Sequence, residues 1–244
     1  MTNKLKSLFI RTSAALYIAA ILIPAYLLDN GRLFGLALEI AMVFAILEAI
    51  SVYISSVFTP IRYSELLITI IVFFELIACI IGLHANVKTK AFSLDFLVGI
   101  LLVCVATDII AYLVGTFIGQ SIFKAQPFPK TSPSKSWEGL ISGFVGGIIT
   151  ALLWANFKLK TSDVREIWGL ILTVPFAILG DYVESRFKRI YGVKDSNDYI
   201  KNAPVLKYFE AMLGGRQGHG GYFDRTDSLV MSITANILLV FVFS

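Results

Sequence analysis

The chain has 244 residues and a formal net charge of +4, with 57% hydrophobic and 16% charged residues, and its mean hydropathy is +0.77. Soluble domains are typically about half apolar and about a quarter charged, so this composition argues against a soluble protein and for an integral membrane protein. The small positive charge carries information on membrane topology, and nothing in it indicates a nucleic-acid partner.

Several apolar runs along the chain are long enough to cross a bilayer. A helix needs about 20 apolar residues to span ~30 Å of hydrocarbon. We therefore predict an all-α fold, a polytopic transmembrane helical bundle of about seven spans joined by cytosolic functional loops. The first run is interpreted as a retained span because no small-residue cleavage site follows it. The predicted spans are residues 12–28, 33–57, 66–84, 94–120, 138–157, 167–184 and 228–244.

Lys and Arg are unevenly distributed between the two ends of these spans. Fifteen of the 21 lie in the N-terminal tail, at Arg62, and in the polar loops 121–137 and 185–227, whereas six lie in the alternate connections. Because loops rich in Lys and Arg stay in the cytoplasm, we expect the N-terminus and both polar loops to be cytosolic. We expect the whole chain, residues 1–244, to form a single membrane domain.

Three acidic residues, Glu39, Glu48 and Glu75, stand alone in the early predicted spans without a motif around them. An ionisable group inside a span is unfavourable unless it is paired or hydrated. We expect these three side chains to pack against polar partners inside the bundle rather than to act in catalysis.

Asp108 belongs to a stretch that contains glycine, ATDIIAYLVGTFIG. Tyr112, Gly115 and Gly119 are spaced so as to share its helical face. The two glycines, four residues apart, predict close packing against another helix. For Asp108 itself, a structural role and a functional role both stay open.

The next segment, SPSKSWEGLISGFVGG at residues 132–147, repeats glycine at every fourth position and so predicts a second close-packing helix face. Ser132-Pro133 predicts a turn, and Ser136 is expected to cap the helix that follows. Lys135 is either an anchor that extends to the membrane surface or a phosphate ligand at a helix N-terminus. The segment alone does not decide between these roles.

The segment GDYVESRFKRIYGVKD, residues 180–195, places charge at the end of the sixth predicted span. If that helix continues, Asp181, Glu184, Ser185 and Lys188 share one face. A solvated helix end explains the lysine well. It explains Asp181 poorly, because this residue directly follows a wholly apolar run.

The segment GHGGYFDRTDS, residues 218–228, combines three glycines with two aspartates. Glycine lets the backbone approach a ligand closely or turn with positive φ. Asp224 and Asp227 lie on one face if the last helix begins there, and Asp227 could instead be its N-cap. With Asp181 they would supply hard oxygen ligands for Mg²⁺. A site in which acidic residues bind a metal ion and neighbouring basic residues bind phosphate is typical of enzymes that transfer phosphoryl or nucleotidyl groups.

The last two segments together resemble the signature of the phosphatidate cytidylyltransferases, the CDP-diacylglycerol synthases. That signature pairs an S-x-x-K-R-x4-K-D element with an H-G-G-x-x-D-R-x-D element. DIIAYLVG, SPSKSWEG and the Gly-Asp at 180–181 also resemble the family, so the likeness covers roughly residues 104–230. The chain departs from the family in its long link, residues 196–217. The matching residues are Ser185, Lys188, Arg189, Lys194, Asp195, His219, Gly220, Gly221, Asp224, Arg225 and Asp227.

The resemblance implies an enzyme at the cytosolic face of a bacterial inner membrane that converts CTP and phosphatidic acid to CDP-diacylglycerol and pyrophosphate. It implies Mg²⁺ as cofactor, with a second, monovalent or divalent cation as an open question, and membrane lipids as surroundings. A homodimer is compatible with the resemblance and with the glycine-lined helices. Residues 1–103 would supply N-terminal spans, 104–230 the catalytic region and 228–244 the last span.

The resemblance also implies roles for individual residues. Those implied in catalysis are Asp181, Lys188, Arg189, Lys194, Asp195, His219, Asp224, Arg225 and Asp227; those in substrate binding are Ser132, Lys135, Ser185, Gly220, Gly221 and Asp108; and those in metal binding are Asp181, Asp224 and Asp227.

Three alternative functions stay open at this point. A lipid kinase that uses CTP on a polyprenol or phytol-type alcohol would also need acids and basic loops. An ion-coupled transporter could line a path with Asp108, Asp181 and Glu75. A catalytically silent scaffold would need none of the charged motif residues. The paired motifs favour the cytidylyltransferase.

Overall fold

The structure is a computed structural model that describes residues 22–28, 32–55, 63–89, 92–159, 164–193 and 223–243. All regular structure in these ranges is helical, which confirms the predicted all-α fold. A short helix covers residues 22–27. The longer elements are α2 (Arg32–Ser55), α3 (Tyr63–Thr89), α4 (Leu94–Phe117), α5 (Trp137–Trp154) with a π-helical turn η2 (Ala155–Leu159), α6 (Val164–Ile190) and α8 (Phe223–Phe243).

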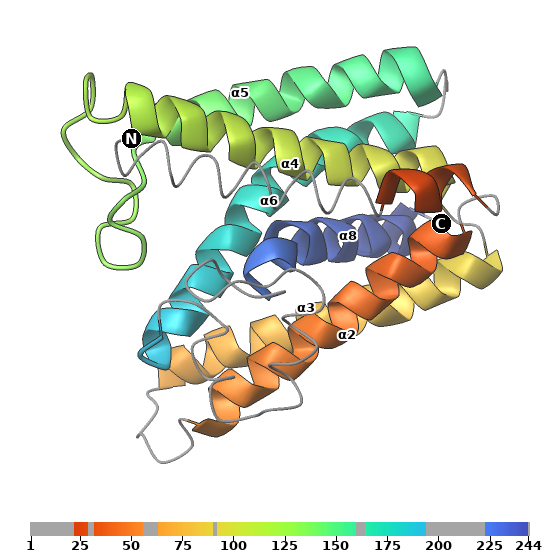
Figure 1. The fold of residues 1–244 in the computed structure, drawn as a ribbon, viewed down its shortest axis with the longest axis horizontal. Helices are drawn as coiled ribbons and strands as arrows, with labels where there is room; N and C mark the ends of the chain where they lie inside the picture. The colour runs from red at the N-terminus through yellow and green to blue at the C-terminus, as the bar shows by residue number, and fades with distance from the viewer. Residues whose placement is uncertain are drawn as a thin grey trace.

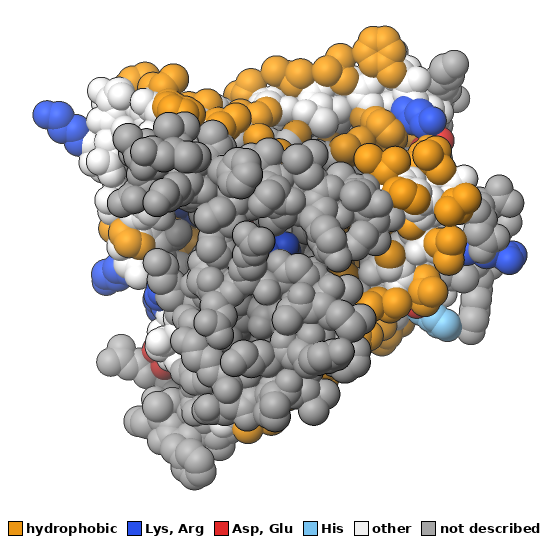
Figure 2. Space-filling model, viewed as in Figure 1, with side chains coloured by type: hydrophobic (Ala, Val, Ile, Leu, Met, Phe, Trp, Pro, Cys, Tyr) orange, Lys and Arg blue, Asp and Glu red, His pale blue; other side chains and the backbone are white. Residues whose placement is uncertain are grey.

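Five of the helices in the described part of the chain, α2 to α6, are long and apolar enough to cross a membrane. Large hydrophobic side chains such as Phe74, Ile77 and Leu152 are exposed on their outer faces. Figure 2 shows such side chains along the edge over α5 and α4. Exposed apolar surface of this extent fits a bilayer, which solvates it, better than water. The predicted number of seven spans is not confirmed. Most of the first predicted span, 12–28, lies outside the described residues, and the last, 228–244, lies on α8 (Phe223–Phe243), which is not among the five candidate spans.

Helices α4 and α5 pack closely because glycines line their contact (Figure 1). A β-carbon at Gly139 would lie 2.7 Å from the carbonyl oxygen of Ala111, and one at Gly143 would lie 2.8 Å from that of Thr107. Both distances are too short for any side chain, so glycine is required for this approach. The repeated glycines predicted to form a packing face do so.

Helix α6 crosses from the region of α4 and α5 toward α2 and α3, and α8 lies between these groups (Figure 1). Gly180 on α6 lies directly against the backbone of α8, since a β-carbon there would lie 2.5 Å from the carbonyl oxygen of Asp227. Polar groups add to the contact: the Ser232 hydroxyl donates to the Thr173 carbonyl at 3.2 Å, and the Asn236 amide donates to the Thr173 hydroxyl at 3.2 Å. Buried hydrogen bonds of this kind hold membrane helices in register.

An aromatic cluster joins the ends of α2, α3, α6 and α8. Phe187 packs against Phe73, Tyr191 and Phe223 with ring centroids 6.3, 4.8 and 5.7 Å apart. The hydroxyl groups of Tyr191 and Thr69 are 2.7 Å apart. Because Phe223 is the first described residue of α8, this cluster positions the start of that helix against the end of α6.

Candidate functional site

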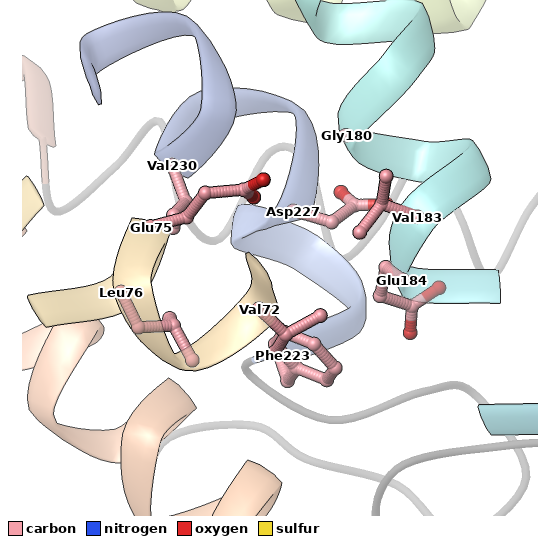
Figure 3. Close-up of a pocket in the computed structure, with 9 residues that line it drawn as sticks. All are labelled: Val72, Glu75, Leu76, Gly180, Val183, Glu184, Phe223, Asp227 and Val230. Carbon is pink, nitrogen blue, oxygen red and sulfur yellow. The ribbon is translucent and has the colours of Figure 1, made fainter. Parts of the chain in front are cut away.

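Three carboxylates from two helices meet where α6 and α8 approach each other. Asp181 and Glu184 lie on α6, three residues apart and therefore on one face, and Asp227 lies in the second turn of α8. One oxygen of each carboxylate lies within 4.8 Å of the others. Figure 3 shows Glu184 and Asp227 beside the small cavity between α6, α8 and α3. We call Asp181, Glu184 and Asp227 the acidic cluster.

The acidic cluster has the properties of a cation site. Carboxylate oxygens are the preferred ligands of Mg²⁺. Glu184 is only 3% exposed, and its Oε1 is a buried oxygen without a well-directed hydrogen bond among the described residues. A cavity of about 10 Å³ adjoins Glu184 and Asp227, which is close to the volume that a single water needs. The three residues could therefore hold one small cation.

Lys188 is the first of two lysines that compensate this negative charge. Its Nζ lies 2.7 Å from Glu184 Oε1 and 2.5 Å from Asp224 Oδ1. The side chains of all three residues are at most 11% exposed. Asp224 therefore lies beside the acidic cluster and contacts Lys188, whereas Glu184 is the third carboxylate of the cluster, together with Asp181 and Asp227. The predicted metal ligands were Asp181, Asp227 and Asp224, so the structure has Glu184 where the prediction has Asp224.

Lys135 is the second lysine, and it reaches the cluster from the segment between α4 and α5. Its ammonium group forms an ion pair with Asp181, whose other oxygen accepts a hydrogen bond from the Ser185 hydroxyl at 3.4 Å. The side chains of Lys135 and Asp181 are 28% and 32% exposed, so this pair is accessible from outside. Lys135 is thus placed at the cluster rather than projecting away from it.

Asp108 approaches the cluster from α4. The Ser228 hydroxyl donates to Asp108 Oδ2 at 3.3 Å. Asp108 precedes the end of α4 by nine residues, as Asp181 precedes the end of α6. Each acid therefore lies about 13.5 Å from the C-terminal end of its helix at 1.5 Å per residue. Asp108 keeps an exposed surface, while its carboxylate contacts Ser228 in a partly buried position.

The segment from residue 118 to 136 is fastened to the helices that flank it. Glu138 accepts hydrogen bonds from the backbone N–H groups of Gln120, Ile122 and Phe123 at 3.1, 2.8 and 2.9 Å. The Ser136 hydroxyl accepts from the Gly139 N–H at 3.2 Å, which confirms the predicted cap. These contacts determine the position from which Lys135 reaches Asp181.

Arg189 also fastens this segment. Its guanidinium donates to the backbone carbonyls of Thr131 and Val193, both at 3.2 Å. The ring of Phe128 packs on that of Tyr182 with centroids 4.9 Å apart. The predicted phosphate ligand Arg189 thus holds two backbone segments together in this structure, and the basic groups in contact with the acids are Lys135 and Lys188.

Other predicted site residues divide into two groups. Ser132 lies in the predicted turn, where its carbonyl accepts from the Lys135 N–H at 3.1 Å, and Arg225 is half-buried in the first turn of α8. The alternative in which Asp227 caps the last helix is wrong, because α8 already begins at Phe223. Outside the described residues lie Lys194, Asp195, His219, Gly220 and Gly221.

The isolated acids of the first spans differ from one another. Glu48 accepts a hydrogen bond from the Phe223 N–H at 2.9 Å and so holds the start of α8. Glu39 lies 3.8 Å from a ring nitrogen of His84. Both have the polar partners that we predicted. Glu75 does not: among the described residues, no hydrogen bond or ion pair reaches its carboxyl group, although it is 7% exposed.

Sequence reasoning does not find which residues Glu48 and Glu138 contact, nor that Glu75 differs from the other isolated acids. Glu48 contacts the start of α8 at Phe223, and Glu138 contacts the segment that follows α4, at Gln120, Ile122 and Phe123. Their only signal in the sequence was the presence of an acid in an apolar run or beside one.

Comparison with known proteins shows a family and several relatives. A sequence model described as the cytidylyltransferase family matches residues 2–203. The chain is 38% identical over 122 residues to a phosphatidate cytidylyltransferase of Haemophilus influenzae, which is 48% of this chain and 37% of the relative. It is 33% identical over 162 residues to one of Staphylococcus aureus, 66% of this chain and 55% of the relative.

A third relative, the phosphatidate cytidylyltransferase of Mycobacterium bovis, is 33% identical over 132 residues, 54% of this chain and 36% of the relative. The chain thus matches between about a third and just over half of the length of these relatives. No solved structure matches the chain.

Proposed function

Because the chain belongs to the cytidylyltransferase family, we propose that it transfers the cytidylyl group of CTP to phosphatidic acid and so forms CDP-diacylglycerol and pyrophosphate. The names of the relatives, phosphatidate cytidylyltransferases, support this pair of substrates. The observation that carries the proposal is the acidic cluster with Lys135 and Lys188 beside it, inside the ends of membrane helices. We place these ends at the cytosolic face of a bacterial inner membrane, as the basic loops favour.

The proposed reaction joins two anions. An oxygen of the phosphatidate phosphate forms a bond to the α-phosphorus of CTP. The bond from this phosphorus to the oxygen that bridges it to the β-phosphorus breaks, and pyrophosphate leaves with that electron pair. A phosphate monoester is already a competent nucleophile, so the site has less need of a general base than of positive charge that offsets the repulsion between phosphates.

Carboxylates of the acidic cluster would hold Mg²⁺, and the buried Glu184 Oε1, which Lys188 contacts at 2.7 Å, would exchange this contact for the ion or share it. When bound, the ion would neutralise charge on the reacting phosphates and on the departing pyrophosphate. This set replaces Asp224 of the predicted metal ligands by Glu184. We propose that Asp224 instead orients Lys188, which it contacts at 2.5 Å.

The two lysines have different surroundings, and we assign them different roles. Lys135 and its partner Asp181 are partly exposed, so a phosphate can displace the carboxylate from the ammonium group. Lys188 is held between two buried carboxylates and keeps the acidic cluster charged and compact. Arg225 and the residues of the glycine-rich motif, His219, Gly220 and Gly221, stay proposed phosphate contacts on the basis of the resemblance alone.

Labelled CTP tests the proposal directly. The purified full-length protein, in detergent micelles that contain phosphatidic acid and Mg²⁺, is expected to transfer label from [α-³²P]CTP into lipid and to release label from [γ-³²P]CTP as pyrophosphate. Lipid labelled only by the γ-phosphate would show a lipid kinase instead. Cation flux in liposomes without consumption of CTP would show a transporter. The variant Glu39→Gln, an acid of α2 outside the cluster, provides the matched control.

A further inference from the structure

Glu75 is a buried acid in the middle of α3 to which the proposed chemistry assigns no role. It is 7% exposed, and in the described part of the chain its carboxyl group has neither a hydrogen bond nor an ion pair. The other isolated acids of the first spans, Glu39 and Glu48, both have polar partners. A polar group that stays buried in a membrane helix without a partner indicates a function.

Glu75 lies between two cavities of different character. On one side is the small cavity that it shares with Glu184 and Asp227 (Figure 3). On the other side is a groove of about 400 Å³ between α3, α6 and α8. The groove is lined by apolar side chains that include Ile71, Phe74, Phe176, Met231 and Leu238.

This groove is open toward the surface that the bilayer would cover. Phe74 and Leu238 on its rim are 56% and 48% exposed, and two of its three walls, α3 and α6, are candidate membrane spans. Glu75 is its one ionisable residue among the described lining residues. The described lining of the groove is therefore apolar except at Glu75, which also lines the small cavity with Glu184 and Asp227, and at Thr234, whose hydroxyl donates to the Glu75 backbone carbonyl.

An amphiphile with a long apolar chain and a phosphate head group matches this change of polarity. A partner helix would fill the apolar part but would leave Glu75 without a polar contact. The volume also lies in the range of about 300–1,000 Å³ that is typical of small-molecule sites. We propose that the groove between α3, α6 and α8 binds an acyl chain of the lipid substrate, and that Glu75 contacts the glycerol-ester region, where this chain joins the head group.

This inference rests on the proposed function for the identity of the lipid, and it makes Glu75 a specificity-determining residue. The ester oxygens of phosphatidic acid accept hydrogen bonds, which a protonated carboxyl group or the N–H of a carboxamide can donate directly, whereas an ionised carboxylate reaches them through one water. Glu75→Gln is therefore expected to preserve the contact, whereas Glu75→Leu removes it. The acidic cluster depends on charge, so its residues should not tolerate the same exchange.

The experiment compares initial rates of lipid labelling by the full-length protein with either substrate varied. Ile71→Trp, which fills the groove, is expected to raise KM for long-chain phosphatidate by roughly tenfold, the effect of displacing about two methylene groups. KM for CTP and the rate with dioctanoyl phosphatidate should change little. Glu75→Leu should raise KM for phosphatidate in the same way, and Glu75→Gln should resemble the wild type. Ile77→Trp adds the same bulk to α3 outside the groove and is the matched control.

A photoactivatable phosphatidate with a diazirine in its acyl chain gives a second measurement that does not depend on turnover. Adducts on residues 71–75 or 231–239 that excess phosphatidate suppresses are expected. Such adducts in a protein without transferase activity would support the groove while the proposed function fails. Equal KM values for Ile71→Trp and Ile77→Trp in an active enzyme, or adducts only elsewhere, would overturn the inference. Loss of all activity in Glu75→Gln would overturn it too, since it would make Glu75 part of the charged site.

Discussion

At the scale of single residues, Lys188 shows how a charged group is tolerated inside a membrane helix. Its ammonium group contacts Glu184 and Asp224, at 2.7 and 2.5 Å, and only 11% of its side chain is exposed. A buried charge is tolerated when it is paired, and removal of one member leaves the others uncompensated. Lys188 thus neutralises part of the charge that the neighbouring carboxylates would otherwise concentrate.

Lys188→Met should consequently destabilise the protein. Removal of one partner of a buried ion pair typically lowers the free energy of unfolding by about 3–5 kcal/mol, and thermal unfolding in detergent measures the loss. Addition of Glu184→Gln to this variant should recover part of it, because one uncompensated charge disappears. A melting temperature equal to that of the wild type would show that the three groups are not coupled.

Asp227 gives a second test at this scale, because Asp227→Asn keeps the size of the side chain and removes its charge. We expect turnover of CTP to fall by at least about 100-fold, as for the loss of a group that stabilises transition-state charge. The Mg²⁺ concentration needed for half-maximal activity should rise, while the melting temperature changes little. Turnover like that of the Glu39→Gln control would refute the metal assignment.

At the scale of elements, the site depends on how closely α6 approaches α8. Gly180 directly precedes Asp181, and the α8 backbone at Asp227 is its nearest neighbour. The absence of a side chain at this position lets two acids of α6 reach the acid of α8. The same physical device, glycine at a helix contact, holds α4 against α5 through Gly139 and Gly143. Helix spacing therefore controls the geometry of the charges.

Gly180→Ala is expected to separate the two helices and so to impair the site more than the fold. The new β-carbon would lie 2.5 Å from the Asp227 carbonyl oxygen and 3.0 Å from the Met231 β-carbon, so the backbones must move apart. Turnover should fall by roughly 100-fold, since misplacement of catalytic groups by about 1 Å can have this effect. Gly35→Ala on α2, where a β-carbon meets nothing within 4 Å, should keep full activity. Similar activities of the two variants would contradict this account.

At the scale of the whole molecule, the functional groups gather toward one end of the bundle. The C-terminal parts of α4 and α6 and the N-terminal part of α8 carry Asp108, the acidic cluster and Lys188. Lys135 lies in the segment that joins α4 to α5 at this end. Together with the basic loops, this arrangement predicts that this end faces the cytosol.

Cysteine labelling in intact bacterial cells tests this orientation. Ser121→Cys, in the exposed segment after α4, should react with a membrane-impermeant maleimide only after the cells are permeabilised. Val164→Cys, exposed at the opposite end of the bundle, should react without permeabilisation. The native Cys79 and Cys104 are buried and should stay unlabelled in both variants. The reverse pattern would place the site on the outer face.

Local patterns of the sequence were enough for several features of this protein. Apolar runs of sufficient length predicted the helices, because each helix satisfies its own backbone hydrogen bonds and needs only an apolar surface to enter a bilayer. Glycine at every fourth position predicted the packing face at Gly139 and Gly143, and Ser136 was predicted to cap the N-terminus of the helix that follows it. Helical periodicity alone predicts that Asp181, Glu184 and Lys188 lie on the same face of their helix. All of these features depend on residues a few positions apart.

Contacts between distant residues were decided only by the tertiary structure. The sequence could not show that Glu184 rather than Asp224 joins Asp181 and Asp227, that Arg189 bonds to backbone carbonyls, or that Glu48 holds the start of α8. It also could not separate Glu75 from the other isolated acids. Hydrogen bonds and ion pairs form only over distances of a few ångströms. Between residues on different helices these distances are set by how the helices pack, and the periodicity of a single helix gives no information about them.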